Sequence, residues 1–346
     1  MAYTLSRILL DNKWETAQLE QLLQREHIHR DANLDYVVGL YDEDDNLIAT
    51  GACFANTLRC LAVDDRRQGE GLLAQIVTHL IEYQMSCGNA HLFLYTKCDK
   101  AAFFESLGFY EIARVDERMT FMENRRTGFS DFLASLSHAK REGRSAALVM
   151  NCNPFTLGHR YLVEQAAAMS DTVHLFVVSE DASLFPFEDR YAMIQAGTAD
   201  LNNVILHRTG SYMISSAVFP SYFLEDDAMV IEMQGRLDVL LFARIAQVLG
   251  IARRYVGEEP FSKVTGIYNK IMMEQLPAAG IACIVIPRWE SEGRAVSASQ
   301  VRQLIHDDRL EEIRPLVPAT TYQYFFTEAG KETIKRIQAA EQVAHY

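Results

Sequence analysis

The stretch AALVMNCNPFTLGH, residues 146–159, decides the fold of the second half of the chain. Its first five residues form an apolar run, which predicts a short buried strand. Helical periodicity then extends from Gly158 to Met169, so the strand passes through a short loop directly into a helix. A strand followed at once by a helix is the unit from which parallel sheets are built, because the chain must cross over before the next parallel strand begins.

The same alternation continues through the rest of this half. The sequence predicts strands at 172–178, 204–207, 252–256 and 281–286 and helices at 188–199 and 264–276. Strands that alternate with helices pair in parallel through right-handed crossovers. We therefore expect an α/β fold with a doubly wound, Rossmann-like parallel sheet, whose ligands bind beyond the carboxyl ends of the strands.

The first half of the chain has a mixed pattern. Two neighbouring strands, 36–41 and 47–54, are expected on either side of the acidic turn 42–46. A strand, a long helix, a further strand and a short helix follow at 58–63, 71–87, 91–96 and 101–107. This order predicts an α+β domain.

The length of 346 residues suits two domains better than one. Helical spacing of Phe129, Phe132 and Leu133 and the polar stretch 140–144 mark a seam between the two patterns. We predict an N-terminal domain at 1–125, a linker helix within 126–145 and a C-terminal domain at 146–346.

Composition argues against several functional classes. The 33 Lys and Arg residues and 46 Asp and Glu residues give a net charge of −13, which is unfavourable for binding nucleic acid. The six cysteines include no CxxC pair, and the histidines show no metal-ligand spacing, so we expect reduced thiols and no metal held by the protein alone. No stretch resembles a signal peptide or could span a bilayer, so we expect a cytoplasmic protein without a membrane partner.

The loop before the helix that starts at Gly158 is suited to a phosphate. A phosphate bound there would meet backbone amides and the positive end of a helix dipole. Pro154 sets the loop, Gly158 lets the backbone approach a ligand, and His159 can stabilise charge that develops on an α-phosphate. Capping or packing explains a Gly–His pair at a helix start equally well.

A second phosphate-binding segment is expected at Ser297, Ser299 and Arg302, which also lie at the start of a stretch with helical periodicity. A Ser-x-Ser pair is by itself commonly only a helix cap. The two segments occupy the first and the last strand-to-helix junctions of one predicted sheet, and this placement favours a shared phosphate site.

These segments resemble the nucleotidyltransferase superfamily of the HxGH class, over residues 146–310. The stretch Thr156–His159 matches the first motif with Thr in its first position, and Val296–Arg302 is similar to the Ile-Ser-Ser-Thr-x-Ile-Arg motif, from which Ala298 departs. The resemblance implies catalytic roles for Thr156, His159 and Arg302. It also implies contacts to ATP from Asn153, Pro154, Phe155, Gly158, Ser297 and Ser299.

In the first half, Arg66, Gly69 and Gly71 lie in a turn between a predicted strand and helix, where successive amides and a cation can surround a pyrophosphate. A plain loop is the alternative. The segment resembles the Arg/Gln-x-x-Gly-x-Gly motif of GCN5-related acetyltransferases, and residues 102–109 are similar to their later helix-to-strand signature. Many of those enzymes carry a tyrosine general acid where this chain has Phe104, which cannot donate a proton. The resemblance therefore implies binding of a CoA-like group rather than acetyltransferase catalysis.

An acetyltransferase-like domain placed ahead of a nucleotidyltransferase-like domain resembles the citrate lyase ligase family over nearly the whole chain. The resemblance implies that ATP, with Mg²⁺, activates acetate as acetyl-adenylate. It further implies that the acceptor is the thiol of a dephospho-CoA-derived group on the acyl carrier subunit of citrate lyase.

Two alternatives stay open at this point. One is a bifunctional N-acetyltransferase and cofactor nucleotidyltransferase, against which Phe104 counts. The other is a non-catalytic sensor of CoA and nucleotide, which would be free to lose His159 or Arg302.

Overall fold

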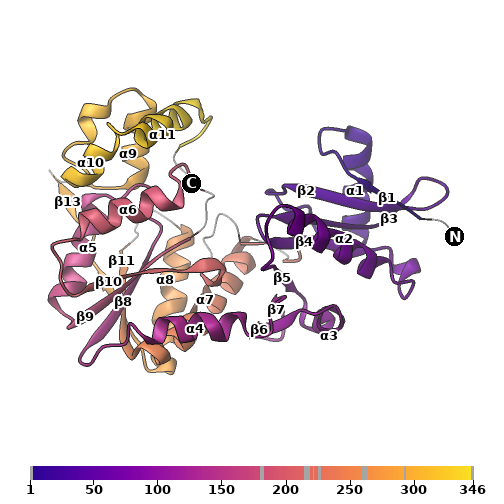
Figure 1. Cartoon of the computed structure of the whole chain (residues 1–346), viewed down its shortest axis with the longest axis horizontal. Coiled ribbons are helices and arrows are strands. Elements are labelled where there is room, and N and C mark those ends of the chain that lie inside the picture. Colours follow the sequence, from indigo (N-terminus) through magenta and orange to yellow (C-terminus); the bar gives the residue numbers. More distant parts are fainter. Residues whose placement is uncertain are drawn as a thin grey trace. The chain divides into compact units, whose positions relative to one another are not determined.

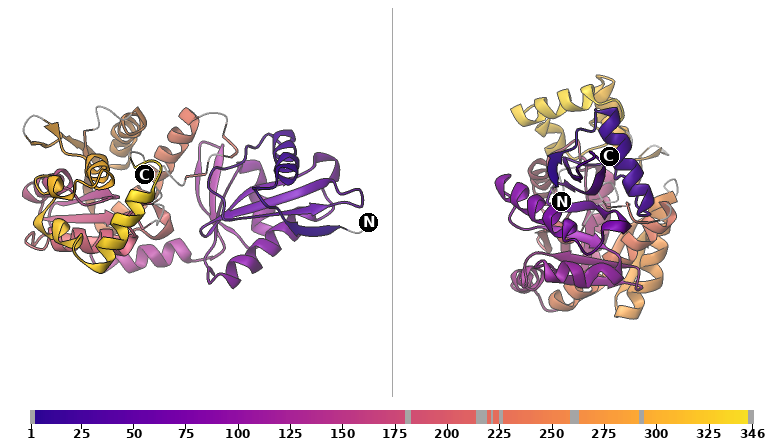
Figure 2. Two further views of the ribbon diagram at one scale, coloured as in Figure 1. Left: turned by 90° about the horizontal axis from the view of Figure 1, so that it is seen from above. Right: turned by 90° about the vertical axis from the view of Figure 1, so that its right-hand side faces the viewer.

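The computed structural model describes residues 3–179, 183–213, 219–220, 222–224, 227–258, 263–291 and 294–343. Its contacts divide the chain into two compact units (Figures 1 and 2). Unit 1 comprises Met1–Asp131 and Phe219–Leu237, and unit 2 comprises Phe132–Val218 and Asp238–Tyr346. Residues 219–237, which the sequence analysis assigned to the C-terminal domain, therefore belong to unit 1.

Unit 1 is built on a seven-stranded mixed sheet with the order β1-β2-β3-β4-β5-β7-β6. Every pair is antiparallel except β4–β5. The strands are β1 (Thr4–Arg7), β2 (Tyr36–Tyr41), β3 (Leu47–Phe54), β4 (Thr57–Val63), β5 (Phe93–Thr96), β6 (Tyr110–Val115) and β7 (Met119–Glu123). The predicted α+β character of the first half is confirmed.

The two long helices of unit 1 bury opposite faces of this sheet. Helix α1 (Lys13–Arg25) packs Leu19 and Leu22 into a cluster with Val37, whereas α2 (Leu72–Ser86) packs Ile76 into a cluster with Val38. Because successive strand residues point to opposite faces, the neighbours Val37 and Val38 mark the two sides. A third helix, α3 (Ala101–Ser106), lies between β5 and β6 in the chain.

Strands β4 and β5 pair over only a short length. Their parallel register joins Thr57 to Phe93 and Leu58 to Leu94. Beyond these pairs, residues of both strands, from Leu61 and from Tyr95 onward, line a single cavity. The cavity therefore lies where the two strands separate.

Unit 2 contains a five-stranded, wholly parallel sheet with the order β10-β9-β8-β11-β12. The strands are β8 (Ser145–Met150), β9 (Thr172–Val177), β10 (Val204–Arg208), β11 (Ile251–Gly257) and β12 (Ala282–Ile286), and a small ribbon joins β13 (Glu290–Ser291) to β14 (Arg294–Ala295). The strand order reverses beside β8, between β9 and β11. The predicted doubly wound parallel sheet is confirmed, and the reversal marks the edge at which such sheets bind ligands.

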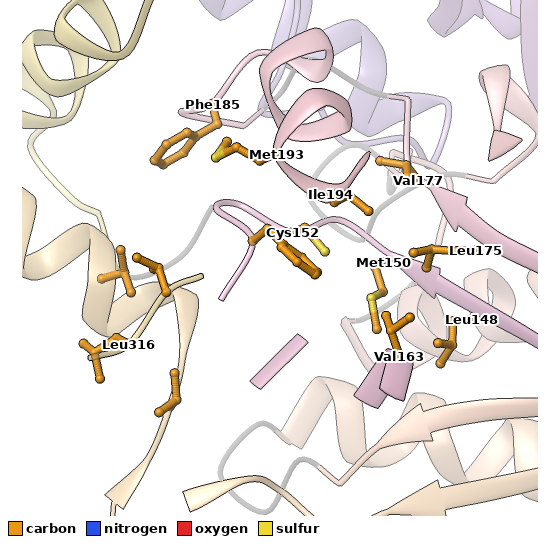
Figure 3. Packing of buried hydrophobic residues seen from close by; sticks show 14 of the residues in the cluster. Leu148, Met150, Cys152, Val163, Leu175, Val177, Phe185, Met193, Ile194 and Leu316 are labelled. Atoms are coloured by element: carbon orange, nitrogen blue, oxygen red, sulfur yellow. The ribbon is translucent and has the colours of Figure 1, made fainter. Parts of the chain in front are cut away.

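Helices cover both faces of this sheet. The structure places α4 (Gly128–Ser137), α5 (Leu157–Ala168), α6 (Phe187–Gly197), α7 (Asp227–Leu249), α8 (Lys263–Gln275), α9 (Ala298–His306), α10 (Ala319–Tyr324) and α11 (Glu328–Ala339). Leu148 and Met150 of β8 face the cluster that includes residues of α5, α6 and α9 (Figure 3), and Ala147 faces the cluster beneath α7. Helix α7 lies in a stretch for which the sequence analysis made no prediction, and its residues are shared between the units.

Two histidines are buried side by side at the edge of this sheet. His174 of β9 and His207 of β10 lie in adjacent strands, with His174 Nδ1 2.9 Å from His207 Nε2. Burial lowers the pKa of both imidazoles to about 4, because the charged form cannot be solvated there. Both rings are therefore neutral near pH 7.

We predict that the protein loses stability as the pH falls from about 6.5 to about 4. In that window the unfolded histidines bind protons while the folded pair does not, so acidification favours the unfolded state. Each histidine contributes up to about 1.4 kcal/mol per pH unit. Urea unfolding followed by circular dichroism at several pH values would measure the slope. The double variant H174Q/H207Q cannot take up these protons and should show a shallower slope; an unchanged slope would contradict the assignment.

Candidate functional site

The loop between β8 and α5 is held at its start by a buried arginine. Arg190 of α6 is 0% exposed, and its guanidinium donates hydrogen bonds to the carbonyls of Asn151 (2.8 Å), Val178 (2.9 Å) and Phe185 (3.1 Å). A buried carbonyl without a donor is costly, and one cation here satisfies two carbonyls at the carboxyl ends of β8 and β9 and a third just before α6. The loop therefore leaves the sheet on a fixed path.

A second buried arginine holds the middle of the same loop. Arg302 of α9 is 3% exposed; its Nε donates to Val343 O at 2.7 Å, and its Nη1 donates to Asn153 O. Burial lowers its pKa to about 10, which leaves the guanidinium charged at neutral pH. Arg302 thus joins the segment at Ser297 to the loop at Asn153, and the geometry favours a positioning role over direct contact with phosphate.

The start of α5 is a reciprocal capping box. Thr156 Oγ1 accepts a hydrogen bond from His159 N (3.3 Å), and Thr156 N donates to His159 Nδ1 (3.1 Å). Because Nδ1 accepts, the proton of the neutral ring resides on Nε2. Burial, with the charges of Arg288 and Arg302, lowers the pKa of His159 to about 4. His159 is therefore a neutral ring that offers an Nε2–H donor.

The starts of α5 and α9 meet. An added Cβ on Gly158 would lie 3.0 Å from Val296 O, so the two segments approach closely only because residue 158 is glycine. Ser297 caps α9 by accepting a hydrogen bond from Gln300 N (3.2 Å), and its Oγ lies 3.0 Å from that of Ser299. Two positive helix ends and two hydroxyls therefore converge beyond the carboxyl edge of the sheet.

The amides available at these helix ends are fewer than the sequence suggested. Leu157 N donates to Leu316 O (2.9 Å), and His159 N is taken by Thr156. Within the described ranges, no partner is found for the amides of Gly158, Ala298 and Ser299. These three N–H groups, together with His159 Nε2–H, can receive phosphate oxygens.

The loop residues predicted to contact ATP differ in their placement. Phe155 is 0% exposed, packs against Gly197 and lies in the hydrophobic core, so any contact with ATP would come from its backbone. Pro154 is also buried, and the Asn153–Pro154 peptide bond is cis. Asn153 is 3% exposed; its Oδ1 accepts from Phe185 N (3.3 Å), and its Nδ2 has no partner among the described residues.

Sequence reasoning assigned no role to Arg288 or Arg190. Arg288 follows β12 at the ligand-binding edge of the sheet and is close enough to His159 for its charge to lower the pKa of that ring. Its position after a predicted strand, 281–286, was a usable signal, because cations at this edge can reach a bound phosphate. The role of Arg190 carried no local signal, since its partners lie on other elements.

This site fits a nucleoside triphosphate. Helix ends, amide donors, a neutral histidine and Arg288 supply the positive potential that phosphates need. The described residues include no group of three or more His, Cys, Asp or Glu side chains that could hold a metal ion.

Unit 1 carries a separate pocket at the opening between β4 and β5. The cavity has a volume of about 490 Å³ and a largely apolar lining that includes Leu61, Tyr95, Phe103 and Phe104. Gly69 (φ +88°) and Gly71 (φ +73°) line it in the left-handed region, which favours glycine. Gly71 precedes α2 without a side-chain cap, so the first amides of that helix remain available to an anion.

The cations at this pocket differ from the one predicted. Arg66 does not line the cavity; its Nε and Nη2 donate to the Asp64 carboxylate at 2.9 and 2.7 Å. This ion pair holds the pKa of Asp64 well below its usual range. Arg67, Lys97 and Lys100 do line the cavity. Arg67 also lies near Asp42 and Glu70, at 3.9 and 3.7 Å.

Fold and site together define a nucleotidyltransferase-type α/β domain combined with an α+β domain that has a pocket between two splayed parallel strands. The family model described as the citrate lyase ligase C-terminal domain matches residues 145–325. The chain is 37% identical over 339 residues to [Citrate [pro-3S]-lyase] ligase of Klebsiella pneumoniae, covering 96% of this chain and 99% of that protein. It is 36% identical over 326 residues to the Escherichia coli (strain K12) protein of the same name, covering 92% of each. The chain belongs to the citrate lyase ligase family, which is a family of enzymes.

Among solved structures, the ribosomal-protein-S18-alanine N-acetyltransferase from Escherichia coli is similar at 21% identity and a TM-score of 0.29. The match covers 35% of this chain and 92% of that one. In the part of the chain that the structure describes, no helix is both long and apolar enough to cross a membrane.

We predict that G158A lowers acetate-dependent ATP–pyrophosphate exchange by at least about tenfold, because the new methyl group would push Val296 O and the start of α9 away from α5. The matched control is G266A in α8, where an added Cβ meets nothing within 4 Å. The control should keep full exchange and gain about 0.5–1 kcal/mol of stability from its better helix propensity. Equal activities of the two variants would contradict a shared site at α5 and α9.

Proposed function

We propose that the protein activates acetate with ATP and transfers the acetyl group to the thiol of the prosthetic group on the acyl carrier subunit of citrate lyase. Support for the reaction comes from relatives named [Citrate [pro-3S]-lyase] ligase that match nearly the whole chain. The observation that carries the proposal is the convergence of the α5 and α9 starts at Gly158 and Val296, beside a neutral His159.

In the first step, an acetate oxygen attacks the α-phosphorus of ATP and pyrophosphate leaves. The amides of Gly158, Ala298 and Ser299 would bind phosphate oxygens, with the Ser297 and Ser299 hydroxyls nearby. His159 Nε2–H would donate to an α-phosphate oxygen as negative charge builds up on it. Arg288 would offset charge on the triphosphate from the end of β12.

Several residues would hold the site in place without touching ATP through their side chains. They are Thr156, Arg302 and the core residues of the loop. Thr156 binds His159 Nδ1 and so fixes the tautomer that presents Nε2–H. Arg302, predicted as a catalytic residue, would instead keep the loop carbonyl at Asn153 and helix α9 in one arrangement. Asn153, Pro154 and Phe155 would shape the backbone that faces ATP, because their side chains are buried.

Mg²⁺ belongs to this proposal as the ion that arrives with ATP. When bound, it would neutralise phosphate charge and orient the leaving pyrophosphate. The amide and serine groups at α5 and α9 fit a partly neutralised triphosphate.

In the second step, a thiolate attacks the acyl carbon of acetyl-adenylate, and AMP leaves with the electron pair of the broken C–O bond. We propose that the unit 1 pocket binds the arm that carries this thiol before and after the transfer, and that the thiol leaves the pocket to react with acetyl-adenylate. The pyrophosphate of the arm would meet Gly69, Gly71 and the start of α2, and Lys97 and Lys100 would face its charge. Phe104 at this pocket cannot act as a proton donor, which weakens the acetyltransferase alternative.

We predict that exchange of labelled pyrophosphate into ATP depends on acetate among a panel of small carboxylic acids. The H159A variant should reduce this exchange by about 100-fold, since it removes a donor to the developing charge. Because the pKa of His159 is about 4, the wild-type rate should show no ionisation of this ring between pH 5 and 8. The absence of exchange with every acid tested would refute the adenylation step.

We predict that K97E weakens use of the carrier by at least about tenfold while acetate-dependent exchange is kept, because a negative charge would then face the pyrophosphate arm. The control K13E makes the same charge change on unit 1 at a residue that does not line the pocket. R66E tests the sequence-based prediction for Arg66 and should behave like K97E if that side chain reaches the arm. Steady-state acetylation of the carrier and exchange would be measured in parallel. Loss of both activities in K97E would rule out a separate thiol pocket.

A further inference from the structure

A segment from the second half of the sequence lines the pocket of unit 1. Tyr222 and Phe223 line the cavity between β4 and β5. The other residues that line it all lie between Glu26 and Phe104 in the sequence. A second hollow of about 800 Å³ lies on unit 1, lined by residues of α1 and the stretch that follows it. Ile28 and Phe223 line both spaces. These two side chains therefore form a wall between two adjoining hollows.

Hydrogen bonds fix the wall in place. Tyr222 OH donates to Tyr95 O at 2.6 Å, at the point where β5 no longer pairs with β4. His29 N donates to Tyr222 O (2.7 Å), and the His29 ring lies with Nε2 2.9 Å from Leu224 O. The Tyr222 hydroxyl thus donates a hydrogen bond to a carbonyl of β5 that lies beyond the last β4–β5 pair.

Buried contacts surround His29 and Tyr222. Asp31, two residues further on, forms a buried ion pair with Arg59 of β4 at 2.8 Å. The Tyr222 ring is buried in the cluster beneath α1 together with Leu19 and Leu22, and this burial raises its pKa. Hydrogen bonds therefore tie Tyr222 both to β5 and to the stretch that follows α1.

Resting on the proposed function, we propose that Tyr222–Leu224 makes the unit 1 pocket blind, with Phe223 as the residue that limits what can extend beyond the thiol. The pyrophosphate of the arm lies at Gly69 and Gly71, so the arm runs through the apolar lining toward the wall. An acceptor amine cannot enter from the second hollow. The pocket then takes a free thiol or a short thioester and rejects longer acyl chains by steric exclusion.

The test uses the full-length protein and three probes: dephospho-CoA, its S-acetyl thioester and its S-hexanoyl thioester. Isothermal titration should give similar affinities for the first two and at least tenfold weaker binding of the hexanoyl thioester. F223A should bring the hexanoyl thioester to within about threefold of the acetyl thioester by joining the two hollows. The control M85A changes an exposed side chain of α2 away from both hollows and should keep the wild-type preference.

Two results would overturn the proposal. One is wild-type protein that binds the hexanoyl and acetyl thioesters equally well; the other is F223A with an unchanged dependence on acyl length. Melting curves would show whether F223A is folded, and F223L provides a milder change that should relax the preference in the same direction. If no probe binds the wild-type protein, the proposed thiol pocket and the proposed role of its wall are both refuted. Acetate-dependent exchange by the same sample would still support the adenylation step.

Discussion

The Arg302 guanidinium donates to Asn153 O from one nitrogen and to Val343 O from another, almost entirely out of water. A cation in that position is tolerated because backbone carbonyls replace its hydration, and those carbonyls in turn need a donor. The arrangement of the candidate nucleotide site depends on this exchange. With Arg190 bound to Asn151 O, two buried charges hold a loop that neither strand nor helix geometry would fix. The meeting of α5 with α9 at Gly158 follows from this constraint, as does the orientation of the capping box that fixes the His159 tautomer.

The division between residues that hold the site and residues that face a ligand changes how the motif at 153–159 is interpreted. Its first half, Asn153 to Phe155, is mostly interior, and its second half presents groups to the edge of the sheet. A phosphate site built in this way is preorganised: its donors are aligned before a ligand arrives, so binding need not order the loop. The lowered pKa keeps the His159 ring neutral at pH 7. A neutral donor needs no counter-ion in an enclosed position, so the ring is ready to donate before a ligand binds.

Much of this could be predicted from local sequence. The turn from β8 into α5 and the parallel strands of unit 2 rest on short-range periodicity, and the glycines at 69 and 71 rest on local turn chemistry. Contacts between distant residues could not be predicted. Arg302 and Asn153 are 149 positions apart, and Tyr222 and Tyr95 are 127 apart, so no spacing rule connects them. A motif also does not distinguish a residue whose side chain touches ATP from one that supports its neighbour; the side chain of Phe155, for example, lies in the core. The ion pair of Arg66 with Asp64 and the position of Arg67 at the cavity likewise follow from the three-dimensional contacts.

Because unit 1 includes Phe219–Leu237, neither unit is encoded by one continuous stretch of the gene. The chain passes between the units after Asp131, after Val218 and after Leu237. A single recombination event therefore cannot exchange one unit for a homologue intact. A gene fragment ending at residue 131 would encode the sheet of unit 1 without Tyr222 and Phe223, and Tyr95 O would lose its donor. A substitution at His29 would therefore change a contact with a stretch encoded nearly two hundred codons downstream.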